Sequence, residues 1–142
     1  MTMYVLDTNV LSEVRRSRPN PNVLEWLASV PDDRLHLSVV VIGEIRRGAR
    51  LRARANVQAG QRLDLWLDEL IDNYGFGDRL LPVNLEDALI WGRITADHKQ
   101  LPETDALIAA QALARDWTVV TRNVKDFERT GVRLLNPFEY EG

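Results

Sequence analysis

The feature that most restricts the fold of this 142-residue chain is the run LHLSVVVI at positions 35–42. It is β-branched and almost continuously apolar, which is typical of a central strand that is covered on both faces of a parallel sheet. Shorter segments of similar character lie at 4–6, 79–83, 117–121 and 132–135. Helical patterns separate these segments, so the sequence predicts an α/β fold with a mostly parallel sheet of four to five short strands and helices on both faces.

The expected helices follow from apolar spacing and from capping residues. A first helix carries Val10, Leu11 and Val14 after the cap chemistry of residues 7–9, and a second covers residues 22–29. Further helical patterns run from Gly43 to about residue 60, along the apolar stripe of 63–74, over 85–100 and over 106–115. Asn84, followed by Asp87, is a cap-like helix start. Residues 122–127 are expected to form a loop and turn.

Length and composition favour one domain, 1–142, which is large enough to bury a core without disulfides. The chain has no cysteine, so disulfides and thiolate metal sites are excluded. No apolar run approaches the roughly 20 residues that cross a bilayer, and the N-terminal residues contain no signal-peptide pattern. We therefore expect a cytoplasmic protein without a membrane segment.

Acidic side chains follow several of the expected strands. Asp7 ends the first strand, Glu44 comes two residues after the LHLSVVVI run, and Asp105 opens the helix that leads to WTVVT. Asn123 and Asp126 follow that last strand. Each acid alone has an ordinary explanation as a cap, an early-helix residue or a turn residue. What those explanations leave open is why all of them fall at one edge of one sheet, where parallel α/β folds bind ligands.

Clustered carboxylates repel one another unless a cation joins them. An all-oxygen set of ligands is the preference of Mg²⁺ or Mn²⁺. Neither of the two histidines, His36 and His98, has ligand-like spacing, so a zinc site is disfavoured. A hard divalent ion held by carboxylates indicates phosphoryl chemistry.

Four motifs together resemble those of the PIN-domain ribonucleases, and they are most similar to the VapC-type toxins of type II toxin–antitoxin modules, in the branch that includes FitB-like proteins. The motifs are YVLDTN, VVVIGEIRRG, PETDALIAAQAL and WTVVTRNVKDF, in the family's order between residues 4 and 127. The resemblance implies a three-layer α/β/α PIN fold and a Mg²⁺-dependent endoribonuclease, for which Mn²⁺ is a possible substitute. It also implies a homodimer and a cognate antitoxin of the VapB or FitA kind.

Carried over position by position, the resemblance makes Asp7 and Asp105 the principal metal-binding aspartates and Glu44 the acid of the second motif. The family's fourth acidic position is Asn123 here, with Asp126 three residues later. This departure leaves open which of the two fills that position and whether a second metal is held.

The same comparison suggests that Thr8 and Thr121 orient the carboxylates. The implied reaction is an in-line attack of activated water on a phosphodiester, with Glu44 or Asp105 as base, to give 5′-phosphate and 3′-hydroxyl ends. One metal ion is expected to be held firmly by Asp7, Glu44 and Asp105, with Asp126 assisting through water.

Arginines dominate the basic residues and are concentrated in the first half of the chain. Residues 1–63 carry a formal charge of +4 and residues 64–142 carry −7. Six arginines and no acid lie between positions 46 and 63, which is either a solvated helix face or a ridge that contacts RNA phosphates. Arg46, Arg47 and Arg50 are the candidate RNA contacts. The apolar stripe around Trp66 and Leu67 is either core or, as the resemblance suggests, interface.

Three other readings remain. A phosphatase with Asp7 as nucleophile would need a second aspartate two residues later, where this chain has Asn9. A receiver-like phosphoacceptor domain would need a lysine after the last strand, and none is well placed. A non-catalytic PIN-like module that binds RNA or protein is the remaining alternative, which the Asn at position 123 favours slightly and the other acids disfavour.

Overall fold

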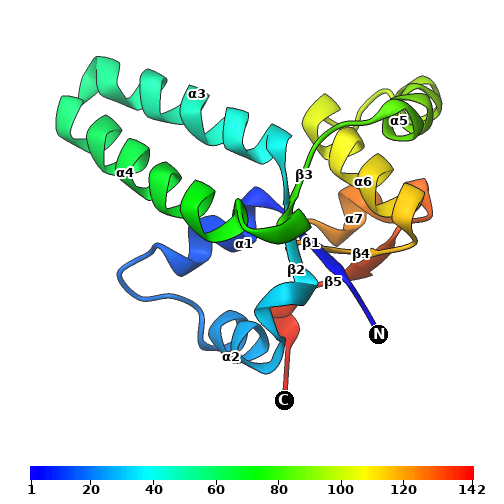
Figure 1. Cartoon of the computed structure of the whole chain (residues 1–142), viewed down its shortest axis with the longest axis horizontal. Helices are drawn as coiled ribbons and strands as arrows, with labels where there is room; N and C mark the ends of the chain where they lie inside the picture. Colours follow the sequence, from blue (N-terminus) through cyan, green and yellow to red (C-terminus); the bar gives the residue numbers. More distant parts are fainter.

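A computed structural model describes residues 1–142 and contains one sheet of five short parallel strands (Figure 1). The strand order is β3-β2-β1-β4-β5, and every neighbouring pair is parallel. The strands are β1 (Tyr4–Leu6), β2 (Leu35–Ser38), β3 (Leu80–Leu81), β4 (Thr118–Val120) and β5 (Arg133–Leu135). The predicted fold class is confirmed, and the sheet is parallel throughout.

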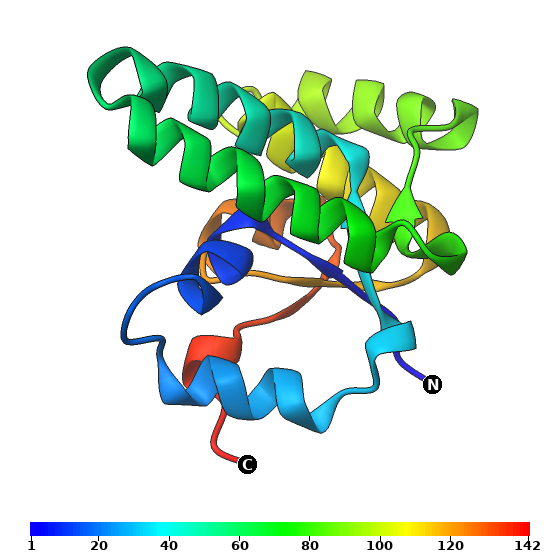
Figure 2. The same ribbon diagram turned by 60° about the vertical axis from the view of Figure 1, so that its left-hand side comes forward.

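Helices cover both faces of this sheet, which gives three layers (Figure 2). The helices α3 to α6 lie on one side, whereas α2 and the C-terminal turn lie on the other. The α-helices are α1 (Thr8–Val14), α2 (Pro21–Ser29), α3 (Val39–Ala55), α4 (Val57–Tyr74), α5 (Leu85–Asp97), α6 (Glu103–Arg115) and α7 (Val124–Phe127). Short 3₁₀ helices are η1 (Asp32–Arg34), η2 (Gly77–Arg79), η3 (Glu128–Thr130) and η4 (Pro137–Glu139).

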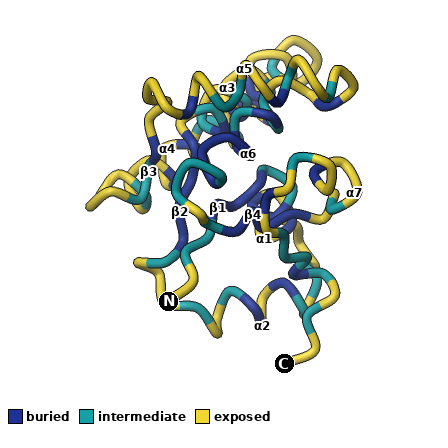
Figure 3. Tube along the Cα trace, turned by 90° about the vertical axis from the view of Figure 1, so that its right-hand side faces the viewer, coloured by how far each residue is buried: buried dark blue, intermediate teal, exposed yellow.

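The core lies where the central strands meet α6 (Figure 3). Val5 of β1, Leu37 of β2 and Val119 of β4 are completely buried, as are Ile108 and Ala109 of α6. Small residues along α6 let it approach the sheet closely, so the position of this helix is tightly set. None of the helices combines the length and the apolar character that spanning a bilayer would require.

The strand predicted at 35–42 is wrong in its second half, because β2 ends at Ser38 and α3 begins at Val39. The Ser38 side chain accepts a hydrogen bond from the backbone N–H of Val40 at 3.1 Å and caps the helix. Within α3, Val41, Ile45 and Ala49 are buried at a spacing of four residues, which is helical periodicity. The helix therefore starts four residues before the predicted point.

Other boundaries also differ from the prediction. The segment at 79–83 forms a strand only at Leu80–Leu81, because Arg79 belongs to η2 and its Nε donates to the carbonyl of Leu35 at 3.0 Å. The helix predicted to run to about residue 60 stops at Ala55, where Asn56 caps the start of α4. Strand β4 and helix α5 are shorter than predicted, and part of the predicted loop at 122–127 forms the short helix α7.

The strand order places the start of the acidic motifs at the middle of the sheet. The chain moves outward from β1 to β2 and β3, and then returns to the other side of β1 to form β4 and β5. The order therefore reverses between β1 and β4, which is the point where parallel α/β sheets bind ligands beyond the carboxyl ends of their strands. Asp7 follows β1 directly and Thr121 follows β4 directly.

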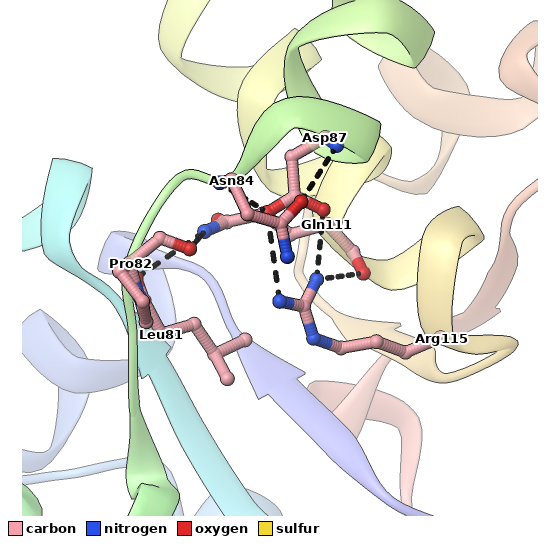
Figure 4. Close-up of polar contacts among 6 residues, drawn as sticks. All are labelled: Leu81, Pro82, Asn84, Asp87, Gln111 and Arg115. Carbon is pink, nitrogen blue, oxygen red and sulfur yellow. Dashed lines mark hydrogen bonds and ion pairs between the residues drawn. The ribbon is translucent and has the colours of Figure 1, made fainter.

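A buried polar network fixes α6 against α5 and β3 (Figure 4). The Asp87 carboxylate is fully buried and accepts a hydrogen bond from Arg115 Nη1 at 2.9 Å. Asp87 also forms a reciprocal capping box with Asn84 at the start of α5, as the sequence indicated. The Gln111 amide donates to the carbonyls of Leu81 and Pro82 at 3.2 and 3.1 Å. These contacts hold the helix whose first turn carries Asp105.

We expect the Asp87→Asn substitution to lower the free energy of unfolding by roughly 3 kcal/mol, because it leaves Arg115 without its buried counter-charge. Urea unfolding followed by circular dichroism measures this loss. The matched control is Asp116→Asn, which removes an exposed ion pair with Arg133 and should cost less than about 1 kcal/mol. Equal losses in the two variants would contradict a stabilising role of the buried pair.

Candidate functional site

The Asp7 carboxylate lies at the carboxyl edge of the sheet and accepts three hydrogen bonds. It caps α1, because one oxygen accepts the backbone N–H of Thr8 at 2.8 Å. The other oxygen accepts the hydroxyl of Thr121 at 2.8 Å and the amide of Asn9 at 3.3 Å. Burial raises the pKa of Asp7, the two hydrogen bonds from Thr121 and Thr8 lower it, and the charges of Glu44 and Asp126 raise it again. Asp7 is therefore both a helix cap and a member of an acidic cluster.

Glu44 joins the cluster from the second turn of α3. Because α3 begins at Val39, Glu44 lies one turn further into the helix than the sequence predicted. The hydroxyl of Thr8 donates to its carboxylate at 3.1 Å. Thr8 thus contacts two acids at once, Asp7 through its backbone and Glu44 through its side chain.

Thr121 and Asn9 connect the ends of β1 and β4. The Thr121 hydroxyl donates to Asp7 and accepts the backbone N–H of Asn123 at 3.0 Å. Asn9 donates to Asp7 and to Thr121 Oγ1, and its side-chain oxygen accepts the backbone N–H of Arg122 at 3.3 Å. Asn123 therefore contributes its backbone to this network, while its side chain makes no hydrogen bond.

Asp105 lies in the first turn of α6 and forms neither a hydrogen bond nor an ion pair through its carboxylate. Burial raises the pKa of Asp105, and the negative charges of Asp7, Glu44 and Asp126 raise it further, to about 7. Asp126, on the short helix α7, is exposed and has no basic partner. Four carboxylates from four segments therefore act on one another, and no side-chain cation balances them.

This acidic cluster, defined as Asp7, Glu44, Asp105 and Asp126, fits a hard divalent cation by its chemistry. Its donors are all oxygens, and their mutual repulsion is the energy that a cation would relieve. As the side chains stand, no three of the chain's acidic or histidine residues form a group that could hold a metal ion. To hold an ion, these acids would have to move closer together or bind it partly through its own water ligands, several of which Mg²⁺ usually keeps.

Comparison with known proteins decides the family. The model of the PIN domain family matches residues 4–132, from the start of β1 through all four acids to the residue before β5. The chain belongs to the PIN domain family. The family predicted from the four motifs is therefore confirmed.

Relatives of this PIN domain match it over nearly its whole length. It is 33% identical to the plasmid stability protein StbB of Pseudomonas syringae pv. tomato, over 96% of this chain and 99% of that protein. It is 32% identical, with the same coverage, to the VapC ribonuclease Y4jK of Sinorhizobium fredii and to the toxin FitB of Neisseria gonorrhoeae. These alignments extend through the C-terminal strand, so the whole domain is shared.

Solved structures show the same arrangement. The PIN domain is similar to a chain of FitAcB from Neisseria gonorrhoeae, with a TM-score of 0.83 and 31% identity over 96% of this chain and 99% of that one. It is also similar to a chain in the structure of FitAB bound to an IR36 DNA fragment, with a TM-score of 0.74, 30% identity and 99% coverage of both chains.

The three arginines predicted to contact RNA lie on α3 at different angles from Glu44. Residues of an α-helix are roughly 100° apart, so Arg47 lies roughly 60° from the direction of Glu44, whereas Arg50 lies roughly 120° and Arg46 roughly 160° away. Arg46 forms an ion pair with Asp64 of α4 at 3.4 Å. Only Arg47 is thus on the side of the helix that carries the acid.

The sequence indicated the acids of this PIN domain better than the side chains that position them. Asn9 entered the prediction as part of a cap and as the residue that stands where a phosphatase would need an aspartate, yet it links Asp7 to the end of β4. The sequence feature that could have indicated this role is the position of Asn9 two residues after Asp7. Arg115 and Gln111, which hold α6, had no recognisable signal, because their partners come from distant segments.

In the absence of metal, we expect the PIN domain to lose stability as the pH rises from about 4 to about 7. The pKa of Asp105 is about 7 in the folded chain against an ordinary value of 3.8, so the folded state binds the proton more tightly than the unfolded state over this range. Urea unfolding in EDTA at about pH 4 and about pH 8 measures the change in free energy.

The Asp105→Asn variant should show a smaller loss over the same pH range, because it cannot ionise. The exposed Asp68 of α4 provides the matched control, Asp68→Asn, which should keep the wild-type pH dependence. An unchanged pH dependence in the Asp105 variant would show that Asp105 titrates normally.

Proposed function

We propose that this chain is a Mg²⁺-dependent endoribonuclease and the toxin of a type II toxin–antitoxin pair. The observation that carries the proposal is the acidic cluster, in which four carboxylates share one sheet edge without a cationic partner. Relatives of similar length that are named VapC ribonuclease and toxin FitB support the ribonuclease and toxin roles. Carboxylate clusters of this kind serve phosphoryl chemistry when they hold a divalent ion.

Asp7 and Asp105 would hold the ion, with Glu44 as the third acid and Asp126 assisting through water. Asp7 is fixed by its hydrogen bonds to Thr8 and Thr121. Asp105 is placed by the backbone of α6 alone, because its carboxylate has no hydrogen-bond partner. A bound divalent ion supplies positive charge to the phosphodiester and makes water a better nucleophile. Mn²⁺, which shares the preference for oxygen ligands, could replace Mg²⁺.

The chain itself supplies the acceptor for the proton of the attacking water. Glu44 and Asp105 are the candidates, because each carboxylate has at least one oxygen that accepts no hydrogen bond. The Thr8 hydroxyl orients Glu44 from one side and leaves its second oxygen free. In-line attack on phosphorus with departure of the 3′ oxygen gives a 5′-phosphate and a 3′-hydroxyl end.

We expect Asp7→Asn and Asp105→Asn each to lower the rate of RNA cleavage at least about a hundredfold, because each removes a negative ligand that binds the ion. Gel analysis of labelled RNA incubated with Mg²⁺ measures the rate, and excess EDTA should abolish cleavage by the wild type. Asp68→Asn is the control of equal charge change and should cleave normally.

Two results would reject the nuclease assignment. One is full activity in a folded Asp7 or Asp105 variant. The other is RNA binding by the wild type with no cleavage in Mg²⁺ or Mn²⁺. That result would favour the non-catalytic PIN-like module, which is the alternative that Asn123 slightly favours.

The proposed antitoxin has an apolar site to bind. A cavity of about 230 Å³, called here the apolar groove, opens between α1, α2 and α4 and is lined almost entirely by apolar side chains. Of its lining residues, Val14 is exposed and Trp66 half-buried, whereas Leu11 and Leu70 are buried. The similar structures are those of FitAcB and of FitAB, which supports a protein partner for this chain. We propose that an apolar helix of the antitoxin fills the groove.

We expect Val14→Arg to weaken capture of the antitoxin at least about tenfold, because it puts a charge at the mouth of an apolar groove. The probe is the product of the gene immediately upstream of the one that encodes this chain, co-expressed and measured by co-purification and titration calorimetry. Leu24→Arg is the control, since Leu24 of α2 has the same 41% exposure and lies outside the groove.

Normal binding by the Val14 variant would place the antitoxin elsewhere on the chain. The homodimer expected from the family resemblance stays a prediction, and light scattering after gel filtration measures it.

A further inference from the structure

We propose that a cleft beside the acidic cluster binds the phosphate backbone of the RNA strand. The cleft, called here the basic cleft, has a volume of about 680 Å³ and lies between the connection from α5 to α6 and the α7–η3 segment. Its size is within the range of ligand sites in proteins. The inference deepens the proposed function and rests on it, since it names the surface that anchors the substrate.

The cations of the basic cleft are the first reason for this assignment. His98, Lys99, Lys125 and Arg129 line it, and Lys99 and Lys125 are the two lysines of the chain. None of the four forms an ion pair with an acid. Two carboxylates also line the cleft, those of Asp97 and Asp126. The three permanent positive charges are thus unpaired and available to an anionic ligand.

Several arginines elsewhere in the chain are committed to internal contacts. Arg16 pairs with Glu13, Arg115 with Asp87 and Arg46 with Asp64. Arg122, which directly follows Thr121, lies over the ring of Phe138 at 4.7 Å. Cations that are held by the protein contribute less to a ligand than cations that are free, so the basic cleft is a stronger candidate for phosphate contacts than these four arginines, and Arg47 on the Glu44 side of α3 is the free arginine that could add to it.

Continuity with the acidic cluster is the second reason. Asp126 lines the basic cleft from α7, and Asn123, the residue before α7, donates its backbone N–H to Thr121, which in turn donates to Asp7. Pro102, another lining residue, is the N-cap of the helix whose first turn carries Asp105. A strand whose phosphate lies at the acids therefore continues directly into the cleft.

The lining of the cleft also indicates how RNA would be bound. It contains no phenylalanine, tyrosine or tryptophan, and its apolar side chains are those of Ala96, Leu101 and Pro102. Only the ring of His98 and the guanidinium of Arg129 could stack on a base, whereas the two lysines can contact only charged or polar groups, so most of the contacts are made to phosphates. Phosphate contacts position a strand and carry no sequence information. The basic cleft should therefore supply affinity, and the choice of RNA must come from other surfaces.

The test is RNA binding by the full chain in EDTA, where cleavage cannot occur. The cleft variant combines Lys99→Gln, Lys125→Gln and Arg129→Gln. The control variant combines Arg52→Gln, Arg54→Gln and Arg62→Gln, which removes the same charge from exposed residues of the α3–α4 hairpin. Fluorescence anisotropy with labelled oligo(U) and oligo(A) measures affinity as a function of salt concentration.

We expect the cleft variant to bind both oligonucleotides at least about tenfold more weakly at low salt, and the control variant to change less than about threefold. The slope of log affinity against log salt should fall by about 2 in the cleft variant, because each lost phosphate contact on a single strand contributes roughly 0.7. Loss on only one of the two sequences would overturn the phosphate assignment in favour of base recognition.

The outcomes also separate this inference from the proposed function. If the wild type cleaves RNA and the cleft variant binds as the wild type does, or the control variant loses as much, the cleft inference fails and the nuclease assignment stands. If the wild type binds without cleaving and the cleft variant loses binding, the nuclease assignment fails and the basic cleft is supported. A wild type that neither binds nor cleaves RNA overturns both.

Discussion

Repulsion among four carboxylates is the constraint on which the rest of this structure depends. Asp7, Glu44, Asp105 and Asp126 come from four segments, and the charges of Glu44 and Asp126 raise the pKa of both Asp7 and Asp105 at one edge of the sheet. An arrangement of like charges persists in a folded chain only where other interactions outweigh it. Here a fully buried core beneath α6, backbone pairing of β1 with β4, and hydrogen bonds to Asp7 supply that compensation. A divalent ion would turn the same repulsion into binding energy.

The interactions that offset this repulsion differ between Asp7 and Asp105. Asp7 is held by its side chain through a helix cap, Thr121 and Asn9. Asp105 has no such contacts, so its position depends on where α6 begins. That position is set far from the acids, by small residues packed on the sheet and by the buried network of Asp87 with Arg115. The stability of α6 and the geometry of the acidic cluster are therefore linked.

Sequence patterns predicted the elements of the fold well and some of their boundaries poorly. Apolar spacing located all five strands, but β-branched propensity extended the second one over Val39–Ile42, where the Ser38 cap and burial at a spacing of four residues favour helix. The break at Asn56 was missed because helix-forming residues surround it. Local preferences of this size are routinely overridden by burial against a neighbouring element, which a single sequence does not reveal.

The sequence by itself determined the fold class, the family and the four acids, because strand ends and motif order are properties of the chain alone. Only the tertiary structure decided how those acids are supported. Thr8 joins Asp7 to Glu44, Asn9 joins β1 to β4, and Arg115 meets a carboxylate 28 residues away. The structure also separated cations that are paired within the protein from the unpaired ones that line the basic cleft. Such pairings arise between segments that are distant in sequence, and their geometry exists only after the core has brought the segments together.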